Sequence, residues 1–571
     1  MSVFDYTRRK SHSVNIGGIP LGSDFQVRLQ SMTSTSTMDT SASVEQCKRI
    51  ADAGASYVRL TAQGVREASN MGIIRQQLRD AGYSIPLVAD IHFNPKAAFE
   101  AAQQVEKVRI NPGNFVDPGR TFKQLSYTDE EYASEITKIS NTLIPFLDLC
   151  KQHGTAIRIG VNHGSLSDRI MSRYGDTPAG MVESAMEFLR VCVAQNFYDV
   201  VISIKASNTV IMVETVRRMV KAMENEGMDF PLHLGVTEAG DGEDGRIKSA
   251  VGIGALLSEG IGDTIRVSLS EDPEFEIPVA RTLVNYIAQR SSAPSIQGEF
   301  YTQYDYCAPQ RRKSVAINNI GGDNPPIVAI DNDECNTSTE TVLRADIFNA
   351  SNYINRGDFI EINAAQRPTP ALKEQADKVI VLYSCHKNHI GEMQAWLHKA
   401  MQLNICNPVI LRIDYGDAAA EDVAIMAAAD FGTLLMNGFR DGIWLRASAI
   451  SPEEITRFAF GILQAARLRI TRTEYISCPS CGRTLFDLQT TLKEVKAATA
   501  HLKGLKIGVM GCIVNGPGEM ADADYGYVGA AAGKVSLYKG KTCVEKNIPA
   551  EEAIEHLINL IKSSDDWVDP V

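Results

Sequence analysis

The chain has 571 residues, of which 44% are hydrophobic and 22% are charged. That composition is typical of a soluble globular protein with several hydrophobic cores, so disulfide cross-links are not needed for stability. The formal net charge of −12 argues against a general nucleic-acid-binding protein, because such proteins carry an excess of basic residues. No run approaches the roughly 18 uninterrupted apolar residues of a membrane-spanning helix, so we expect no association with membranes.

The N-terminal residues and the cysteines indicate a cytoplasmic protein. Residues 1–10 are charged and no apolar stretch follows them, so a secretory signal is not expected. There are 11 cysteines, an odd number in a chain without an export signal. This favours metal ligands or free thiols over a disulfide framework.

Residues 26 to about 290 repeat one pattern eight times, a short β-branched run followed by a helical stretch. Eight such units predict a (β/α)8 barrel with a parallel sheet, and we expect this domain to cover residues 1–290. An open, doubly wound sheet is the alternative, but no Gly-x-Gly-x-x-Gly follows the first strand. The expected strands end at Thr33, Thr61, His92, Gly113, Asn162, Ser207, Glu238 and Ser268.

Residues 291–470 are predicted to form an α/β insert domain, of which residues 291 to about 310 form a linker. Residues 256–268 resemble residues 434–448, which suggests a degenerate second barrel, although a generic α/β insert explains the pattern nearly as well. Few charged residues end its runs, so we interpret the insert as a structural spacer. The expected strands are 315–319, 327–330, 359–363, 379–383, 409–413 and 442–447, and the charged strand ends are Arg412, Asp414 and Arg446.

Residues 471–571 form a third expected domain, small and α+β, which carries a cysteine motif. Cys478-Pro-Ser-Cys481 brings two sulfurs close enough to bind one metal centre, and Cys512 precedes a Gly-Pro-Gly turn. A zinc site would need a fourth ligand, for which Cys543 is the nearest thiol, and a thioredoxin-like pair would leave Cys512 unexplained. An iron–sulfur cluster with three thiolates and one other ligand is the third interpretation, and Glu519 could supply that ligand. Zinc and a cluster both remain open from the spacing.

Cationic side chains are expected to gather at one end of the barrel. The strand–helix loops of such barrels open at the carboxyl ends of the strands, where the chemistry takes place. Five cations at one mouth would repel each other unless a multiply charged anion lies among them, and arginine matches phosphate oxygens well. We therefore predict a substrate that carries a diphosphate, with Asn162 and Ser268 as neutral donors. The cations are Arg59, Arg109, Arg158, Lys205 and Arg266.

Each cation taken alone has a simpler explanation, an ion pair with a neighbouring acid such as Asp90, Glu238 or Asp263. Glu238 and Asp90 are also candidate proton donors if burial or the cations adjust their pKa. His92 and His233 lie at strand ends too, where a lone histidine is more often only a hydrogen-bonding partner.

Motifs along the whole barrel and the C-terminal domain resemble the 4-hydroxy-3-methylbut-2-enyl-diphosphate synthase family. The resemblance covers residues 15–290 and 470–540, in one order. The motifs are Ser31–Thr33, Val88–Phe93, Arg109–Asn114, Arg158–Asn162, Lys205–Ser207, Leu232–Gly240, Leu257–Ser268, Cys478–Cys481 and Gly511–Glu519.

This resemblance implies an oxidoreductase of the methylerythritol phosphate route to isoprenoids. The family opens the ring of 2-C-methyl-D-erythritol 2,4-cyclodiphosphate and removes a hydroxyl with two electrons from ferredoxin or flavodoxin. It implies a 4Fe-4S cluster held by Cys478, Cys481, Cys512 and Glu519. It also implies that the five cations, together with Asn162 and Ser268, bind the diphosphate of the substrate. Asn515 would orient the bound substrate group. Glu238, with Asp90 and His92 as lesser candidates, would handle protons.

The insert resembles that of the three-domain members of the family. In two-domain members, the cluster domain of one subunit caps the barrel of its dimer partner. Here the insert could let the cluster domain reach its own barrel, so a homodimer with shared sites and a site within one chain are both open. The insert is expected to contribute no catalytic residue.

Overall fold

The computed structural model describes residues 4–91, 94–116, 126–331, 343–513, 518, 520 and 522–569. The chain separates into two compact units. The barrel unit comprises Arg9–Gly245, Gly262–Arg281 and Arg472–Val571, and the insert unit comprises Met1–Arg8, Arg246–Ile261 and Thr282–Thr471. The barrel unit therefore includes both the predicted barrel strands and the C-terminal cysteine domain.

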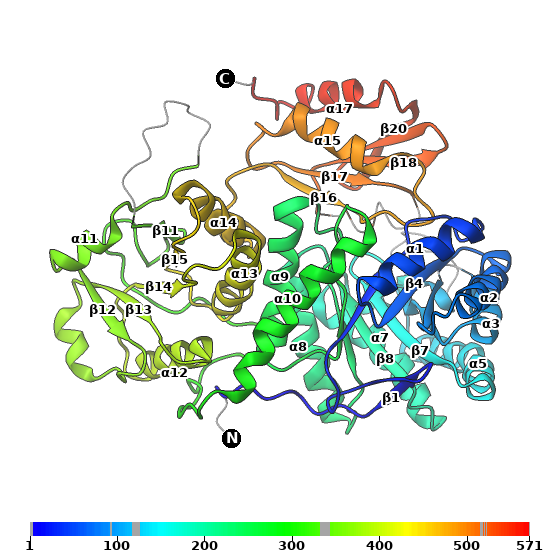
Figure 1. Cartoon of the computed structure of the whole chain (residues 1–571), viewed down its shortest axis with the longest axis horizontal. Helices are drawn as coiled ribbons and strands as arrows, with labels where there is room; N and C mark the ends of the chain where they lie inside the picture. Colours follow the sequence, from blue (N-terminus) through cyan, green and yellow to red (C-terminus); the bar gives the residue numbers. More distant parts are fainter. Residues whose placement is uncertain are drawn as a thin grey trace. The chain divides into compact units, whose positions relative to one another are not determined.

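Eight parallel strands close into a barrel in the order β10-β3-β4-β5-β6-β7-β8-β9, which confirms the predicted fold class (Figure 1). Each of the eight predicted runs supplies one strand, and the helix after it returns the chain for the next parallel strand. The strands are β3 (Arg28–Met32), β4 (Tyr57–Ala62), β5 (Leu87–Ile91), β6 (Lys107–Ile110), β7 (Ala156–Asn162), β8 (Val200–Lys205), β9 (Leu232–Leu234) and β10 (Thr264–Ile265).

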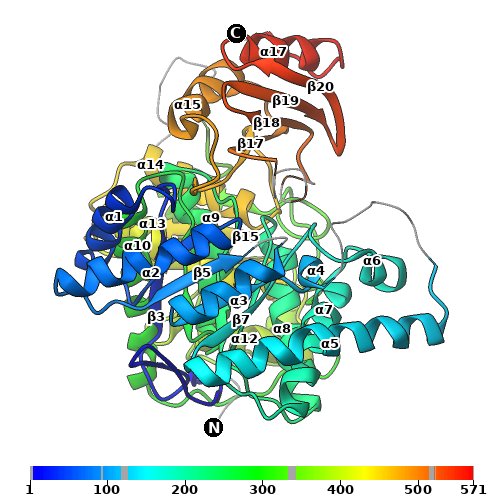
Figure 2. The same cartoon turned by 90° about the vertical axis from the view of Figure 1, so that its right-hand side faces the viewer.

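Helices surround these strands, and Figure 2 shows α2, α3 and α5 side by side on the outside of the barrel. Polar side chains define several helix starts: Asp39 accepts a hydrogen bond from the Ala42 amide, and Thr128 and Glu131 form a reciprocal capping box. The helices that follow the barrel strands are α1 (Thr40–Asp52), α2 (Val65–Asp80), α3 (Pro95–Gln104), α4 (Pro112–Phe115), α5 (Asp129–His153), α6 (Asp168–Tyr174), α7 (Pro178–Ala194), α8 (Thr209–Asn225), α9 (Gly242–Ser258) and α10 (Glu276–Ala288).

The floor of the barrel is apolar. A hairpin of β1 (Val14–Ile16) and β2 (Ile19–Leu21) precedes the first barrel strand. Its buried side chains form one hydrophobic cluster with the inward-facing residues near the strand beginnings. Because the hairpin closes this end, polar side chains inside the barrel can reach solvent only at the other end. The cluster contains Val14, Ile16, Leu21, Tyr57, Val88, Ala156 and Val201.

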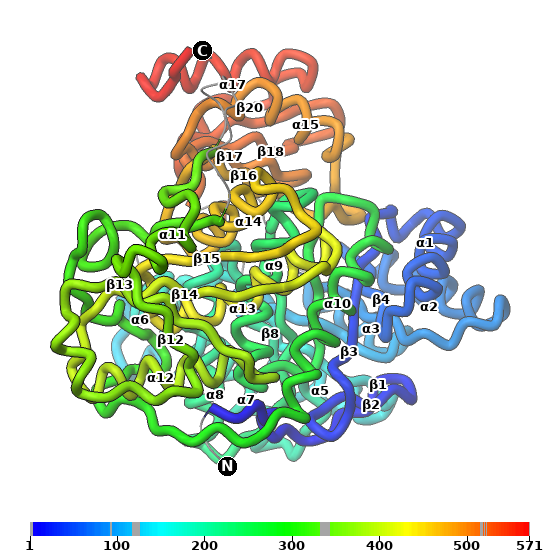
Figure 3. The backbone as a smooth tube through the Cα atoms, turned by 60° about the vertical axis from the view of Figure 1, so that its left-hand side comes forward, coloured from blue at the N-terminus to red at the C-terminus, as the bar shows by residue number. Residues whose placement is uncertain are grey.

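The insert unit contains a five-stranded parallel sheet in the order β11-β15-β14-β13-β12, and Figure 3 follows β12 to β15 side by side. The predicted strand at 315–319 is wrong: Ile317 and Ile320 form only an isolated bridge, because Asn318 has a left-handed backbone with φ 54 and turns the chain. The elements are β11 (Ile327–Ala329), α11 (Ala350–Asn355), β12 (Phe359–Asn363), β13 (Val379–Tyr383), α12 (His389–Gln402), β14 (Val409–Asp414), α13 (Ala420–Met436), β15 (Gly442–Arg446) and α14 (Pro452–Ala465).

Asp263 in the barrel and Asp441 in the insert sheet accept equivalent hydrogen bonds from the amides of neighbouring strands. The Asp263 carbonyl accepts from the amide of Arg28 in the first barrel strand, and its carboxylate accepts from the Leu232 amide of β9, both at 2.9 Å. The Asp441 carbonyl likewise accepts from the amide that begins β11 at 3.2 Å, and its carboxylate accepts from the amide that begins β14 at 3.0 Å.

This correspondence favours a degenerate barrel over a generic insert. The strand order is that of a barrel left open between β11 and β12 within the described residues. The same alignment places the fully buried Trp444 where the barrel has Arg266. The insert therefore lacks the counterpart of one predicted anion-binding side chain.

The C-terminal domain is a five-stranded mixed sheet on which the helices α15 and α17 pack. Strands β16 to β18 are parallel, and β18 to β20 are antiparallel. Its own hydrophobic core lies between the sheet and the helices. The elements are β16 (Glu474–Ser477), α15 (Leu488–Thr499), β17 (Lys506–Met510), β18 (Tyr525–Ala531), β19 (Lys534–Lys539), β20 (Thr542–Pro549) and α17 (Ala553–Lys562). Over the part of the chain that the structure describes, no helix combines the length and the apolar character needed to span a membrane.

Candidate active site

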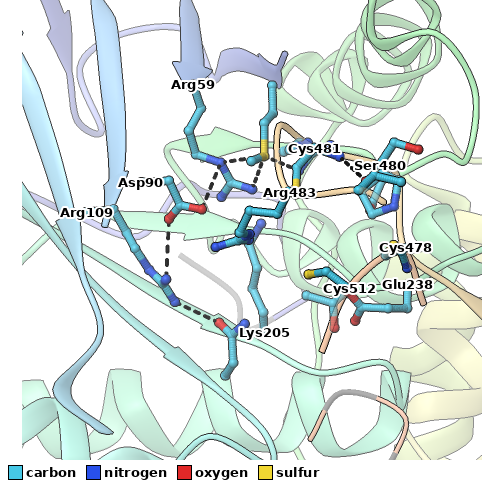
Figure 4. Close-up of a pocket in the computed structure, with 18 of the residues that line it drawn as sticks. Arg59, Asp90, Arg109, Lys205, Glu238, Cys478, Ser480, Cys481, Arg483 and Cys512 are labelled. Carbon is cyan, nitrogen blue, oxygen red and sulfur yellow. Dashed lines mark hydrogen bonds and ion pairs between the residues drawn. The ribbon is translucent and has the colours of Figure 1, made fainter. Parts of the chain in front are cut away.

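A pocket in the barrel unit opens at the carboxyl ends of the barrel strands and is also lined by the C-terminal cysteines (Figure 4). The structure brings together here most of the residues predicted from the sequence. The predicted residues that line the pocket are Arg59, Asp90, Arg109, Arg158, Asn162, Lys205, Glu238, Arg266, Ser268, Cys478, Cys481 and Cys512. The predicted residues His92, Asn515 and Glu519 lie outside the described residues.

Strand register explains why charged side chains meet in this pocket. Asp90 of β5 pairs with Arg109 of β6, which pairs with Arg158 of β7. Neighbours in a parallel register point to the same face, so all three side chains point into the barrel. Asp90 approaches Arg109 at 3.3 Å and Arg59 at 3.9 Å. One carboxylate thus lies between two buried guanidinium groups.

Arg266 has its own carboxylate partner, which the sequence did not suggest. Its Nε and Nη2 donate to the two oxygens of Glu276 at 3.0 and 2.8 Å, and both side chains are buried. Burial lowers the pKa of Arg266, but Glu276, together with Asp90 and Cys481, outweighs burial, and the net shift is upward. Glu276 also accepts from the Ser31 hydroxyl. This bidentate pair fixes the Arg266 guanidinium at the rim of the pocket.

Arg158 and Lys205 are less well compensated. Burial, followed by neighbouring Arg59, lowers the pKa of each well below its usual value. Two guanidinium nitrogens of Arg158, Nε and Nη1, have no hydrogen-bond partner among the described residues. Burial also lowers the pKa of Arg59, to about 10, although Asp90 opposes the shift. A cluster of buried cations like this one is typical of a site at which an anionic ligand neutralises the positive charges.

The C-terminal domain is joined directly to the rim of this barrel. Ala239, in the loop after β9, forms a parallel bridge with Ser477. The Ser270 hydroxyl bonds the Ser477 hydroxyl at 2.8 Å and donates to the Cys478 carbonyl at 2.9 Å. Gly482 lies so close to the barrel loop that an added Cβ would be 2.7 Å from the Thr35 carbonyl oxygen. Barrel cations and cysteines of the same chain therefore line one pocket.

The placement of the three cysteines bears on which metal centre they could hold. All three line the pocket, and Cys478 Sγ accepts a hydrogen bond from the Gly511 amide at 3.3 Å. Within the described residues, no three His, Cys, Asp or Glu side chains converge on one metal-ion position. Cys543, the fourth thiol that a zinc site would need, does not line the pocket.

The candidate proton donors differ in their placement. Glu238 is buried in the pocket wall and has a left-handed backbone with φ 49, a strained conformation of the kind that clusters at active sites. Asp90 lies between two arginines. His233 is fully buried in the barrel beneath the pocket, where burial and then Arg158 lower its pKa.

Nine further residues line the pocket that the sequence did not single out as site residues. The most informative is Arg483, because a cation two residues after Cys481 would be suited to compensate metal-bound thiolates. For the others the sequence carries no comparable signal. The full set is Met32, Ser203, Thr237, Pro479, Ser480, Arg483, Thr484, Met510 and Gly511.

Comparisons with known proteins agree with this arrangement. The model of the GcpE TIM-barrel domain matches residues 11–281, and that of the GcpE protein C-terminal domain matches residues 474–563. A Phocaeicola vulgatus protein, called 4-hydroxy-3-methylbut-2-en-1-yl diphosphate synthase (flavodoxin), is 56% identical over all of both chains. Proteins of the same name from Porphyromonas gingivalis and Akkermansia muciniphila are 52% and 44% identical and cover at least 99% of both chains.

The chain belongs to the 4-hydroxy-3-methylbut-2-en-1-yl diphosphate synthase family. The matches to this synthase family extend over 99% of this chain or more, so these relatives also contain the insert that neither domain model covers. The name of the synthase family denotes an oxidoreductase, and membership implies an iron–sulfur cofactor. A zinc-binding scaffold without redox activity, the alternative weighed from the sequence, is not favoured.

Proposed function

We propose that this chain reduces 2-C-methyl-D-erythritol 2,4-cyclodiphosphate, opening its ring and removing a hydroxyl to give 4-hydroxy-3-methylbut-2-enyl diphosphate. The observation that carries the proposal is the pocket in which buried barrel cations and three cysteines of one chain meet. Family membership supports the same reaction, and the relatives' name supports flavodoxin as the electron donor, with ferredoxin as the alternative.

The barrel cations would bind the diphosphate of the substrate. Arg59, Arg109 and Arg266 are held by carboxylates, so their forks are fixed before the substrate arrives, which lowers the entropy lost on binding. Arg158 and Lys205 have lowered pKa values in the free protein, and a neighbouring anion would favour their charged forms. Asn162 and Ser268, on the same wall, would add neutral donors.

Cys478, Cys481 and Cys512 would hold a 4Fe-4S cluster at the mouth of the barrel, with Glu519 as the proposed fourth ligand. A cluster bound there supplies reducing power to the substrate one electron at a time. The loop from Cys478 to Gly482 contacts the barrel at Ser270 and Thr35, so the chain would bind its substrate between the barrel and the C-terminal domain and exclude bulk water from the reacting carbon. Asn515 would orient the bound group of the substrate.

Loss of the hydroxyl as water takes up protons together with the two electrons. Glu238 would deliver a proton near the departing hydroxyl, and its burial in the pocket wall supports that role. Asp90 and His92 are the lesser candidates. A Glu238→Ala variant with unaltered turnover would remove this residue from the mechanism.

We also propose a division of labour along the chain. Residues 1–290 would bind the substrate, residues 291–470 would act as a structural spacer, and residues 471–571 would carry the cluster. Because barrel and cysteine side chains of one chain line the pocket, each subunit would hold a complete site even in a homodimer. The ten cysteines of the described residues form no disulfide, which supports a cytoplasmic location.

The function is tested with anaerobically purified full-length protein. We expect iron and sulfide to be bound, and we expect reduced flavodoxin to drive conversion of the cyclic diphosphate. Bound zinc without iron, or no conversion by an iron-loaded protein, would contradict the proposal. Mixing Arg158→Met chains with Cys512→Ser chains tests the subunit composition. We expect no activity from the mixture, because restored activity would require sites shared between chains.

A further inference from the structure

Arg483 is a cation that the cysteine loop carries into the barrel mouth. It lies two residues after Cys481, in the loop between β16 and α15. Gly482 allows the loop to approach the barrel, because any larger residue would meet the Thr35 carbonyl oxygen at 2.7 Å. Of the six lysines and arginines that line the pocket within the described residues, Arg483 alone comes from the C-terminal domain.

The Arg483 side chain lies between the barrel residues and the cysteines that line the pocket (Figure 4). It is 9% exposed and lines the pocket together with Arg59, Asp90, Cys481 and Cys512. It lies close enough to Cys481, Asp90 and Arg59 for their charges to act on its own. The guanidinium thus lies between the barrel cations and the cysteines.

Part of the Arg483 guanidinium remains available to a ligand. Its Nε and Nη1 are buried and have no hydrogen-bond partner among the described residues. Leaving buried charged donors unpaired is unfavourable, and native structures rarely do so unless a ligand or water completes the set. Arg59 and Arg158 line the same pocket, so an anion is the ligand that satisfies both the charges and the donors.

We propose that Arg483 is a substrate-binding residue that holds the substrate's diphosphate through its unpaired Nε and Nη1 while it remains beside Cys481. The anion is then gripped jointly by the barrel and by the cysteine loop, and binding of the anion fixes the position of Cys481. This inference rests on the proposed function and adds to it a contact from the cluster-bearing domain. It also gives Gly482 a role, because the close approach at that residue delivers Arg483 to the anion.

The test compares Arg483→Met and Arg483→Lys with the parent protein, all full-length, cluster-loaded and oxidised. Arg472→Met is the matched control, since Arg472 is also a cation of the C-terminal domain that pairs with a barrel residue, Asp244, outside the pocket. Binding of inorganic diphosphate and of the cyclic diphosphate is measured by calorimetry without turnover. The midpoint potential of the cluster is measured in the same samples.

We expect Arg483→Met to weaken binding of both ligands by about 10- to 100-fold, the range for loss of a charged hydrogen-bond donor. Arg483→Lys keeps the positive charge but lacks the planar guanidinium, so its affinity should lie between those of Arg483→Met and the parent protein. Arg472→Met should bind within about threefold of the parent protein, because exposed pairs contribute little. Arg483→Met should also lower the midpoint potential, because it removes a positive charge beside the cysteines, and the charge around a cluster helps set its potential.

Diphosphate binding of parental strength by cluster-loaded Arg483→Met would overturn the inference. If that variant loads no cluster, Arg483→Lys decides: affinity equal to that of the parent overturns the inference, and weaker binding with a normal iron content supports it. A parent protein that binds neither diphosphate nor the cyclic substrate would instead contradict the proposed function. The two failures are therefore distinguishable.

Discussion

Asp90 compensates two buried arginines, so its charge should stabilise the substrate-free protein. Its oxygens lie 3.3 Å from Arg109 and 3.9 Å from Arg59. At an effective dielectric constant of about 20, these distances give gross attractions of about 4–5 kcal/mol each. Desolvation of the three groups offsets much of this. Removing one partner of a buried pair costs roughly 3–5 kcal/mol, and asparagine retains some hydrogen bonding, so we expect Asp90→Asn to lower the free energy of unfolding by about 3 kcal/mol.

The same substitution should make stability depend more strongly on an anion. Asp90→Asn leaves the pocket one positive charge richer, so bound diphosphate gains attraction and restores part of the lost stability. Urea unfolding followed by circular dichroism, with and without inorganic diphosphate, measures both effects. The control is Asp52→Asn, because that carboxylate accepts from Tyr83 at an exposed position and should change stability little. If Asp90→Asn unfolds at the parental urea concentration and diphosphate stabilises both proteins equally, Asp90 does not compensate the cations.

Three further perturbations test other parts of the structure. Lys107 is fully buried, its Nζ has no hydrogen-bond partner among the described residues, and burial followed by Arg158 lowers its pKa well below the usual value. The unfolded chain therefore binds a proton that the folded chain does not, and stability falls as the pH drops from about 10.4 towards the folded pKa. Lys107→Met should raise the unfolding free energy at pH 8 by roughly 1–3 kcal/mol. It should also reduce the slope of the unfolding free energy against pH, between pH 8 and 10, by up to about 1.4 kcal/mol per pH unit. An unchanged slope would contradict the lowered pKa. Gly482→Ala should push the cysteine loop off Thr35 and raise KM for the cyclic diphosphate at least about tenfold at normal iron content, and an unchanged KM would show that the close approach is not needed. Glu276→Gln frees Arg266 from its bidentate partner and should cost about 3 kcal/mol in urea unfolding, whereas a loss below about 1 kcal/mol would mean that Arg266 finds another partner.

The sequence by itself determined the barrel and the identity of most of the pocket. Each barrel unit is a local pattern, a β-branched run followed by a helix, and the closed sheet follows from repeating it eight times. Residues at the carboxyl ends of the strands must then share one rim, which is why Arg59, Arg109 and Arg158 were predicted together and line one pocket. The proximity of Cys478 and Cys481 follows equally from the local sequence, because only two residues separate them.

Only the tertiary structure decided which long-range partners those side chains have. Glu276 lies ten positions beyond Arg266 and across a turn whose path no local pattern fixes. Arg483 enters the pocket because Gly482 packs on a loop more than 400 residues away in sequence, and the strand predicted at 315–319 failed because one left-handed asparagine turned the chain. Charge balance depends on distances between segments that are far apart in sequence. Local patterns place a charged residue on a rim, but only packing determines what neutralises it.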